Sequence, residues 1–243
     1  MSRAISLPSR QAGLALSRTR DAVRELEWFG DVQRDGYNPS YVEARDALAD
    51  AAKAYDWSAV LLLLEREPAL VNSWRVGGTS WYTPLHQAAH GGAPPEVVER
   101  LISLGAWRTL RNAKGQLAVD IAQEHGRRQL LPLLETSPAR SVHARALERM
   151  QGHFHEVIRG RVAAIEGVLA RLRLPDLGPL TELPSAKFWF SVPGMFGGFA
   201  FWLAADGERP MLVSENWCRV VDGSGERHEV TPEGARLIER GFV

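Results

Sequence analysis

The chain has 243 residues, enough for one large domain or two of modest size. Hydrophobic residues make up 45% and charged residues 24%, and the formal net charge is +0 because basic and acidic residues both number 29. This balance argues against binding of nucleic acid or an anionic membrane through the net charge of the whole chain. No apolar run is long enough for a membrane-spanning helix, and the N-terminus lacks a signal-peptide core, so we expect a cytoplasmic protein. Cys218 is the only cysteine, which excludes an intrachain disulfide and a multi-cysteine metal site.

Residues 1–43 form the first predicted segment. Four apolar residues recur at helical spacing: Ala12, Leu16, Val23 and Leu26. Gly30 and Gly36 mark turns, and the aromatic residues of this stretch make it too apolar for a free tail. We therefore expect a helical cap segment that packs against the residues that follow.

The stretch 81–106 carries the strongest local pattern of the chain, WYTPLHQAAHGGAPPEVVERLISLGA. Thr83 can cap a helix through its hydroxyl, and Pro84 suits the first helical position because its missing N–H costs nothing there. A second apolar stripe follows at spacings of three and four: Val98, Leu101 and Ile102. Gly105 fits the left-handed turn that ends a helix. The pattern predicts two short helices joined by a tight turn.

These motifs resemble an ankyrin repeat, whose signature is T-P-L-H-x-A-A followed by V-x-x-L-L-x-x-G-A. His86 aligns with Asp120, 34 positions later, and degenerate units flank the central one. The resemblance covers about residues 44–135 and implies about three helix pairs over residues 44–136. In this family the histidine of the motif is expected to be structural, and the repeats generally bind other proteins through finger loops and a concave helical face.

Residues 137–175 have apolar residues at spacings of three or four, which predicts an amphipathic helical linker or cap ending near Pro175. Its polar face is locally basic and includes Arg171 and Arg173. We interpret this face as solvated. An acidic partner or nucleic acid is the open alternative, and nucleic-acid binding would show a steep salt dependence.

From residue 176 to residue 243 the pattern changes to aromatic and β-branched runs separated by glycine turns. It predicts a small antiparallel sheet of three or four strands covered by the preceding helix, with Trp202 on the face opposite to Phe199, Phe201 and Leu203. Residues 231–240 are predicted to form a capped C-terminal helix. The predicted fold class is therefore α+β: an ankyrin-repeat helical solenoid with helical caps, followed by a small antiparallel β-sheet domain.

Seven residues form the candidate partner-binding set: Trp74, Arg75, Trp81, Tyr82, His90, Trp107 and Arg108. Clustered Trp, Arg and Tyr side chains on loops are typical of a binding hot spot. The alternative is that these tryptophans pack against the N-terminal segment or the C-terminal domain. A possible ligand site lies in the C-terminal sheet: Trp189, Trp202, Trp217, Arg219 and His228.

Catalytic signals are weak. A Cys218 and His228 nucleophile pair is conceivable only if adjacent strands bring the two together. His153 and His155 diverge on a helix and cannot share a metal ion, so we expect no metal site. We also expect no cofactor and no catalytic residues. The predicted function is non-catalytic protein–protein interaction by a bacterial adaptor, regulatory or immunity-type protein, with another protein as the partner. The alternative is an enzyme or small-ligand-binding protein that works from the aromatic-rich sheet, with the repeats as scaffold.

Overall fold

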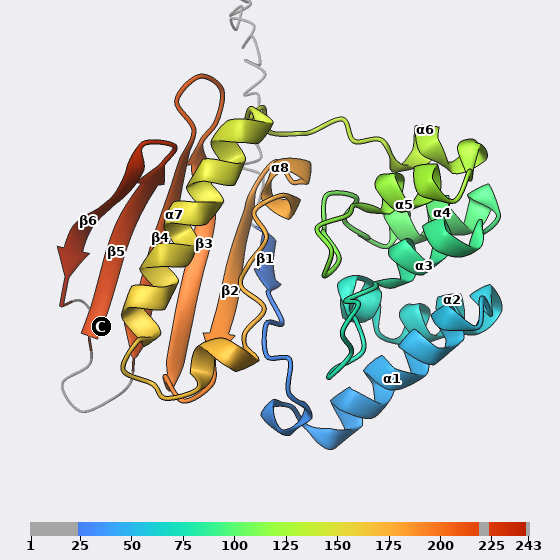
Figure 1. Cartoon of the computed structure of the whole chain (residues 1–243), viewed down its shortest axis with the longest axis horizontal. Helices are drawn as coiled ribbons and strands as arrows, with labels where there is room; N and C mark the ends of the chain where they lie inside the picture. The colour runs from blue at the N-terminus through green and yellow to red at the C-terminus, as the bar shows by residue number, and fades with distance from the viewer. Residues whose placement is uncertain (1–23, 219–223, 242–243) are drawn as a thin grey trace, which may run out of the picture.

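The computed structural model describes residues 24–218 and 224–241. These residues form a mixed α and β protein made of two units that lie side by side (Figure 1). One unit is a stack of helices, and the other is a sheet with a long helix across one face. The helix expected from Ala12, Leu16 and Val23 lies outside the described residues.

Over the residues that the structure describes, the helix stack contains three successive helix pairs. They are α1 (Pro39–Lys53) with α2 (Trp57–Arg66), α3 (Pro84–Gly91) with α4 (Pro95–Ser103), and α5 (Ala118–Glu124) with α6 (Leu131–Leu134). The first helix of each pair contacts the first helix of the next, so the pairs are stacked in chain order. Short 3₁₀ helices complete the connections: η1 (Arg34–Gly36), η2 (Pro68–Asn72) and η3 (Arg128–Leu130).

Local sequence signals set where these helices begin. Asn38 caps α1 by accepting a hydrogen bond from the Ser40 N–H, and Thr83 caps α3 by accepting one from the His86 N–H. Pro84 occupies the first turn of α3, as the sequence predicted. The buried side chains of the stack are aliphatic and fit closely between helices: Leu48, Leu64, Leu85, Ala88, Leu101 and Ile121. Burial of each larger side chain contributes about 1.5–3 kcal/mol, which is what holds such short helices together.

Within the described residues the sheet has six strands in the order β1-β2-β3-β4-β5-β6. The strands are β1 (Arg24–Glu27), β2 (Ala186–Val192), β3 (Gly197–Ala205), β4 (Met211–Cys218), β5 (Ser224–Thr231) and β6 (Gly234–Arg240). Strands β2 to β6 form an antiparallel meander, whereas β1 pairs with β2 in parallel. The predicted three or four strands were too few. Residues 24–27, expected in a helical cap, belong to the sheet because they pair with a strand about 160 residues later.

The long helix α7 (Ala144–Val162) covers one face of the sheet (Figure 1). Its buried residues recur every four positions: Met150, Phe154, Ile158 and Val162. The Phe154 ring lies 6.4 Å from that of Phe199 and 5.0 Å from that of Phe201, both on β3. Trp202 points to the opposite face, as the alternation predicted. The helix ends well before Pro175, and η4 (Val168–Arg171) and α8 (Pro179–Glu182) follow.

The predicted C-terminal helix is wrong, because residues 234–240 form β6 and pair antiparallel with β5. A Thr-Pro pair can begin a helix, but it can also enter a turn, and here Thr231 pairs with Gly234 in the connection between the strands. The free edge of β5 offers the following residues a hydrogen-bonding partner that no local pattern reveals.

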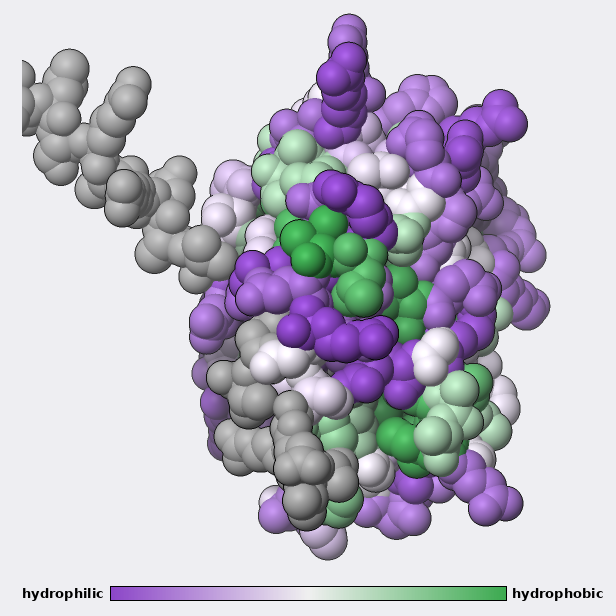
Figure 2. Space-filling view, turned by 90° about the vertical axis from the view of Figure 1, so that its left-hand side faces the viewer, coloured by the Kyte–Doolittle hydropathy of each residue, from purple (hydrophilic) through white to green (hydrophobic). Residues whose placement is uncertain are grey.

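Strand β6 forms an exposed edge of the sheet. Figure 2 views the molecule from this side and shows a small hydrophobic area enclosed by hydrophilic residues. On β6, Leu237 and Ile238 are 42% and 41% exposed, and Arg236 forms a 2.7 Å ion pair with Glu229. Charged side chains on an edge strand discourage pairing with other chains. None of the described helices is both long and apolar enough to cross a membrane.

Candidate functional site

Trp74, the first residue of the predicted hot spot, is buried where the helix stack meets the sheet unit. The Arg173 guanidinium lies over three indole rings, at centroid distances of 4.3, 4.9 and 5.2 Å: those of Trp74, Trp81 and Trp28. Arg173 also donates a 2.6 Å hydrogen bond to the Arg111 carbonyl oxygen. Burial lowers the pKa of Arg173 to about 10, so the side chain stays charged at neutral pH. The sequence predicted a solvated Arg173, whereas the residue is only 4% exposed.

Arg45 is the second buried cation that contacts Trp74. Its Nε and Nη2 donate hydrogen bonds of 3.0 and 2.7 Å to the Trp74 carbonyl oxygen, and its guanidinium is 4.9 Å from the Trp74 ring. Three further rings surround this guanidinium at 5.2 to 5.9 Å: Phe29, Tyr37 and Tyr41. Two buried cations thus contact one indole, and aromatic faces compensate for much of the lost hydration. We call Arg45, Trp74 and Arg173 the arginine–tryptophan joint.

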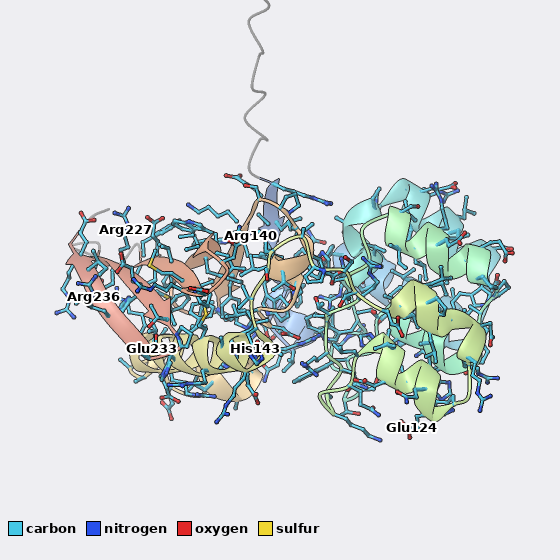
Figure 3. The ribbon with its side chains drawn as sticks, turned by 90° about the horizontal axis from the view of Figure 1, so that it is seen from above. Glu124, Arg140, His143, Arg227, Glu233 and Arg236 are labelled. Atoms are coloured by element: carbon cyan, nitrogen blue, oxygen red, sulfur yellow. The ribbon has the colours of Figure 1, made fainter. Side chains whose placement is uncertain are left out.

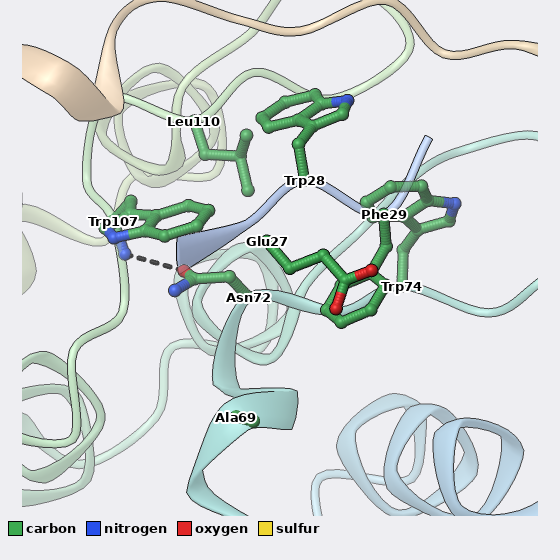
Figure 4. A pocket seen from close by; sticks show the side chains of 8 residues that line it. All are labelled: Glu27, Trp28, Phe29, Ala69, Asn72, Trp74, Trp107 and Leu110. Atoms are coloured by element: carbon green, nitrogen blue, oxygen red, sulfur yellow. Dashed lines mark hydrogen bonds between the residues drawn. The ribbon is translucent and has the colours of Figure 1, made fainter. Parts of the chain in front are cut away.

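Trp107 and Arg108 also contact other parts of the chain. The backbone N–H of Trp107 donates a 2.8 Å hydrogen bond to Asn72 Oδ1 (Figure 4), and the Trp107 ring lies 5.3 Å from that of Phe188 on β2. Arg108 lies 3.5 Å from the Glu182 carboxylate of α8. Both residues therefore connect the helix stack to the sheet unit.

Arg75 forms ion pairs with Asp46 and Asp50 of α1. Five of the seven residues proposed for partner binding thus lie at or near the junction of the helix stack with other parts of the chain: Trp74, Arg75, Trp81, Trp107 and Arg108. These contacts agree with the alternative of internal packing that the sequence left open.

Tyr82 and His90 lie in a different place, on the surface of the helix stack. Tyr55 and His125 occupy positions 35 residues before and after His90, each following the first helix of its pair. The Tyr55 hydroxyl and His90 Nδ1 form a 2.7 Å hydrogen bond, and the rings of His90 and His125 lie 4.3 Å apart. Tyr82 meets His90 edge-on at 6.3 Å. We call Tyr55, Tyr82, His90 and His125 the aromatic ladder.

Two glycines at the end of α3, its last residue Gly91 and its C-cap Gly92, allow close packing around the aromatic ladder. A Cβ atom on Gly91 would collide with the Tyr55 ring of the preceding pair, and one on Gly92 would meet the Arg127 side chain of the following pair. Gly92 also adopts a φ of 70°, which suits glycine because it lacks a Cβ. Arg127 donates hydrogen bonds of 3.4 Å to the His90 carbonyl oxygen. These contacts fix the ladder across all three helix pairs.

The aromatic ladder is accessible to solvent. Tyr55 is 42% exposed and has a φ of 60°, a left-handed conformation that is uncommon for residues other than glycine. Partial burial, together with the neighbouring His125 and Arg127, lowers the pKa of His90, so its imidazole is neutral at pH 7. Sequence reasoning missed Tyr55 and His125, although their equal spacing from His90 could have identified both.

The tryptophans of the predicted ligand site lie on the sheet face away from α7. The rings of Trp189 and Trp217 lie 4.5 Å apart, and the Trp202 ring centroid is 4.6 Å from Lys187 Nζ. Arg227, which is on the same face, points away from α7 (Figure 3). This face carries indole rings and paired charges.

His228 lies on the opposite face of the sheet, where it lines a hollow together with Arg161 of α7. Ser214 is the residue of β4 that pairs with His228, and Cys218 is four positions farther along that strand, a separation of roughly 13 Å. The strands therefore do not bring Cys218 and His228 together, and the conceivable nucleophile pair is not formed. Arg219 lies outside the described residues. The described members of the predicted ligand site do not converge on one cleft.

The residues that commonly bind metal ions are dispersed in the described part of the chain. No group of three or more His, Cys, Asp or Glu residues there could hold a metal ion. His155 Nε2 instead forms a 2.8 Å hydrogen bond with the Pro175 carbonyl oxygen. Burial lowers the pKa of His155, which keeps the imidazole neutral at pH 7.

No family model and no curated protein matches this chain. Among solved structures, one similar chain belongs to the complex of a predatory endopeptidase from Bdellovibrio bacteriovorus with an immunity protein. The match has 28% sequence identity and a TM-score of 0.30, and it covers 36% of this chain and 42% of that chain. The overlap is thus below half of either chain.

Proposed function

We propose that this chain is a non-catalytic protein-binding protein whose helix stack, which resembles ankyrin repeats, serves as the recognition scaffold. The aromatic ladder carries this proposal, because it presents Tyr55, His90 and His125 in one accessible row across three helix pairs. Aromatic side chains have few rotatable bonds and supply large contact areas, which is why they are enriched at binding hot spots.

The packing around the ladder supports binding at low entropic cost. Side chains that are already fixed by a hydrogen bond, by Gly91 and by Arg127 lose little freedom when a partner covers them. A rigid scaffold with a preformed surface is therefore the mechanism that we propose for recognition.

The proposed partner is another protein, and the proposed setting is the bacterial cytoplasm, where the chain would act as an adaptor, regulatory or immunity-type protein. The alternative of an enzyme or small-ligand binder has less support, because Trp189 and His228 lie on opposite faces of the sheet. The balanced net charge gives no support to nucleic-acid binding.

The experiment is affinity purification with the full chain, followed by measurement of the dissociation constant with the purified partner. The double variant Tyr55→Ala/His125→Ala is expected to weaken binding about 30-fold, since the loss of a hot spot costs about 2 kcal/mol. Leu62→Ala is the matched control, because Leu62 is 52% exposed on α2 and lies outside the ladder. Unchanged affinity in the double variant, combined with a loss in Trp189→Ala, would contradict the proposal.

A further inference from the structure

A hollow of about 320 Å³ lies between the C-terminal half of α7 and the strands β5 and β6. In Figure 1 these two strands extend past the edge of α7, so the helix covers them only in part. Gly160 of α7 helps to keep the hollow open, because it carries no side chain and a Cβ atom there would meet nothing within 4 Å. The volume lies near the lower end of the range for small-molecule sites.

Polar side chains interrupt the apolar face of the sheet next to this hollow. His228 lines the hollow from β5, and Ser214 is the residue of β4 that pairs with it. Asn216 follows two positions later on the same face, and both β4 residues are fully buried. Among the described residues, three of these polar atoms have no hydrogen-bond partner: Ser214 Oγ, Asn216 Nδ2 and His228 Nδ1. Buried polar groups without a partner destabilise a fold and are uncommon, so packing alone does not explain them.

Arg161 is a cation of the hollow whose hydrogen-bond acceptors are neutral. Its Nε donates a 2.8 Å hydrogen bond to Asn216 Oδ1, and its Nη2 donates one of 2.7 Å to the Ser224 carbonyl oxygen. Within the described residues it forms no ion pair with a carboxylate. These contacts hold the guanidinium at the hollow and leave its charge without a counter-ion.

The two carboxylates that line the hollow are already paired. Glu226 lies 3.0 Å from Arg240, and Glu156 lies 2.7 Å from Arg159. The charge of Arg161 is therefore in excess and favours an anionic ligand. Because Glu156 and Glu226 also line the hollow, they would repel a doubly charged phosphate more strongly than a singly charged carboxylate.

We propose that this hollow binds a small organic carboxylate, whose oxygens accept hydrogen bonds from the Arg161 guanidinium and the His228 imidazole. Val157 and Gly160 line the side of the hollow that contacts the apolar part of the ligand. Asn216 is a positioning residue, since it holds Arg161 through Nε. The site lies on the sheet unit, apart from the aromatic ladder, so it goes beyond the function proposed above.

The first test uses benzoate as the probe and follows the isotope-labelled full chain by NMR. The signals of Arg161 and His228 should shift in a saturable way, with a dissociation constant below about 10 mM. Benzamide has nearly the same shape but no charge, and it should bind about tenfold more weakly or worse, because charge-assisted hydrogen bonds are lost. Inorganic phosphate should also bind more weakly. Equal affinity for benzoate and benzamide would overturn the proposal, and so would equal or tighter binding of phosphate.

The second test places the probe in the hollow. Arg161→Gln should weaken benzoate binding about tenfold or more, whereas Arg149→Gln removes an exposed charge of α7 outside the hollow and should have no effect. Gly160→Leu should fill the hollow and abolish binding. Gly152→Leu is its matched control, since a Cβ atom at either glycine has open space and leucine suits a helix interior. Unchanged affinity in Gly160→Leu would refute the site, even if Arg161→Gln failed to fold.

His228 provides an independent measurement. Burial is the main cause that lowers the pKa of its imidazole, Glu226 acts in the opposite direction, and Arg240 and Arg161 lower the pKa further. An anion beside the ring stabilises the protonated form, so saturating benzoate should raise the pKa of His228 by about half a unit, which corresponds to about threefold tighter binding to that form. NMR titration with and without benzoate measures this shift, and the pKa of His90 on the helix stack should not respond. An unchanged pKa of His228 in saturating benzoate would contradict its proposed contact with the ligand.

Discussion

Replacing Trp74 with alanine should reduce the free energy of unfolding by about 5 kcal/mol, the largest effect that we expect from a single substitution. Removing a buried tryptophan costs about 3–5 kcal/mol through lost burial and a residual cavity. Here the change also removes from Arg45 and Arg173 the ring that lies 4.9 and 4.3 Å from their guanidinium groups, while their mutual repulsion remains. At about 2–4 °C per kcal/mol, the melting temperature should fall by about 10–20 °C in a calorimetric scan.

Trp202→Ala is the matched control for this change. Trp202 contacts the Lys187 ammonium, but it lies on the sheet face opposite to α7 and is only partly buried. Its loss should cost about 1 kcal/mol, because exposed cation–π contacts are weak. If the two variants melted within about 3 °C of each other, the arginine–tryptophan joint would not hold the two units together in the way we describe.

Acidification should destabilise the protein through His86, the buried histidine of α3. Burial, reinforced by the charge of Arg173, lowers the pKa of His86 to about 4, below the value of about 6.5 for an unfolded chain. Between these values the unfolded state binds more protons, so the free energy of unfolding falls as the pH decreases from 6.5 to 4. At 1.36 kcal/mol per pKa unit, this single residue accounts for a loss of about 3 kcal/mol. Urea denaturation followed by tryptophan fluorescence across this pH range measures it.

His86→Asn isolates this contribution. Asparagine can keep a hydrogen bond to Thr83, which His86 Nδ1 contacts at 2.8 Å, but it does not titrate in this range. The variant should therefore be less stable than the unaltered chain at pH 7.5. On acidification, however, its free energy of unfolding should fall by about 3 kcal/mol less than that of the unaltered chain. His143→Asn is the control, because His143 is exposed at the start of α7 and asparagine caps helices well. An acid-induced loss in His86→Asn as large as in the unaltered chain would contradict the assignment.

Features that depend on neighbouring residues in the chain could be predicted from the sequence. Thr83 and Pro84 begin α3, and Gly105 has the left-handed φ of 98° expected at the end of a helix. Strand alternation placed Trp202 opposite to Phe201. Each of these outcomes follows from local backbone preference or from the two-residue period of a strand.

Features that depend on distant partners could not be predicted. Strand β1 exists because Arg24–Glu27 pair with β2, and β6 exists because β5 offers a free edge. The burial of Arg45 and Arg173 depends on aromatic rings gathered from separate segments, whereas arginine at helical spacing normally indicates a solvated face. For the same reason, the tryptophans of the predicted hot spot could not be distinguished from an internal joint by composition alone.

The aromatic ladder illustrates an intermediate case. His90 was among the predicted partner-binding residues, but Tyr55 and His125 were not, because each lies in a degenerate flanking unit. The 35-residue spacing is present in the sequence, yet only the stacked helix pairs bring the three rings into contact.

Hydrogen–deuterium exchange of the full chain, with and without its purified protein partner, tests partner recognition by the helix stack most directly. Our account predicts slower exchange over residues 53–57, 82–91 and 123–127, the segments that carry the aromatic ladder. Protection confined to the strands of the sheet, with these three segments unchanged, would contradict it.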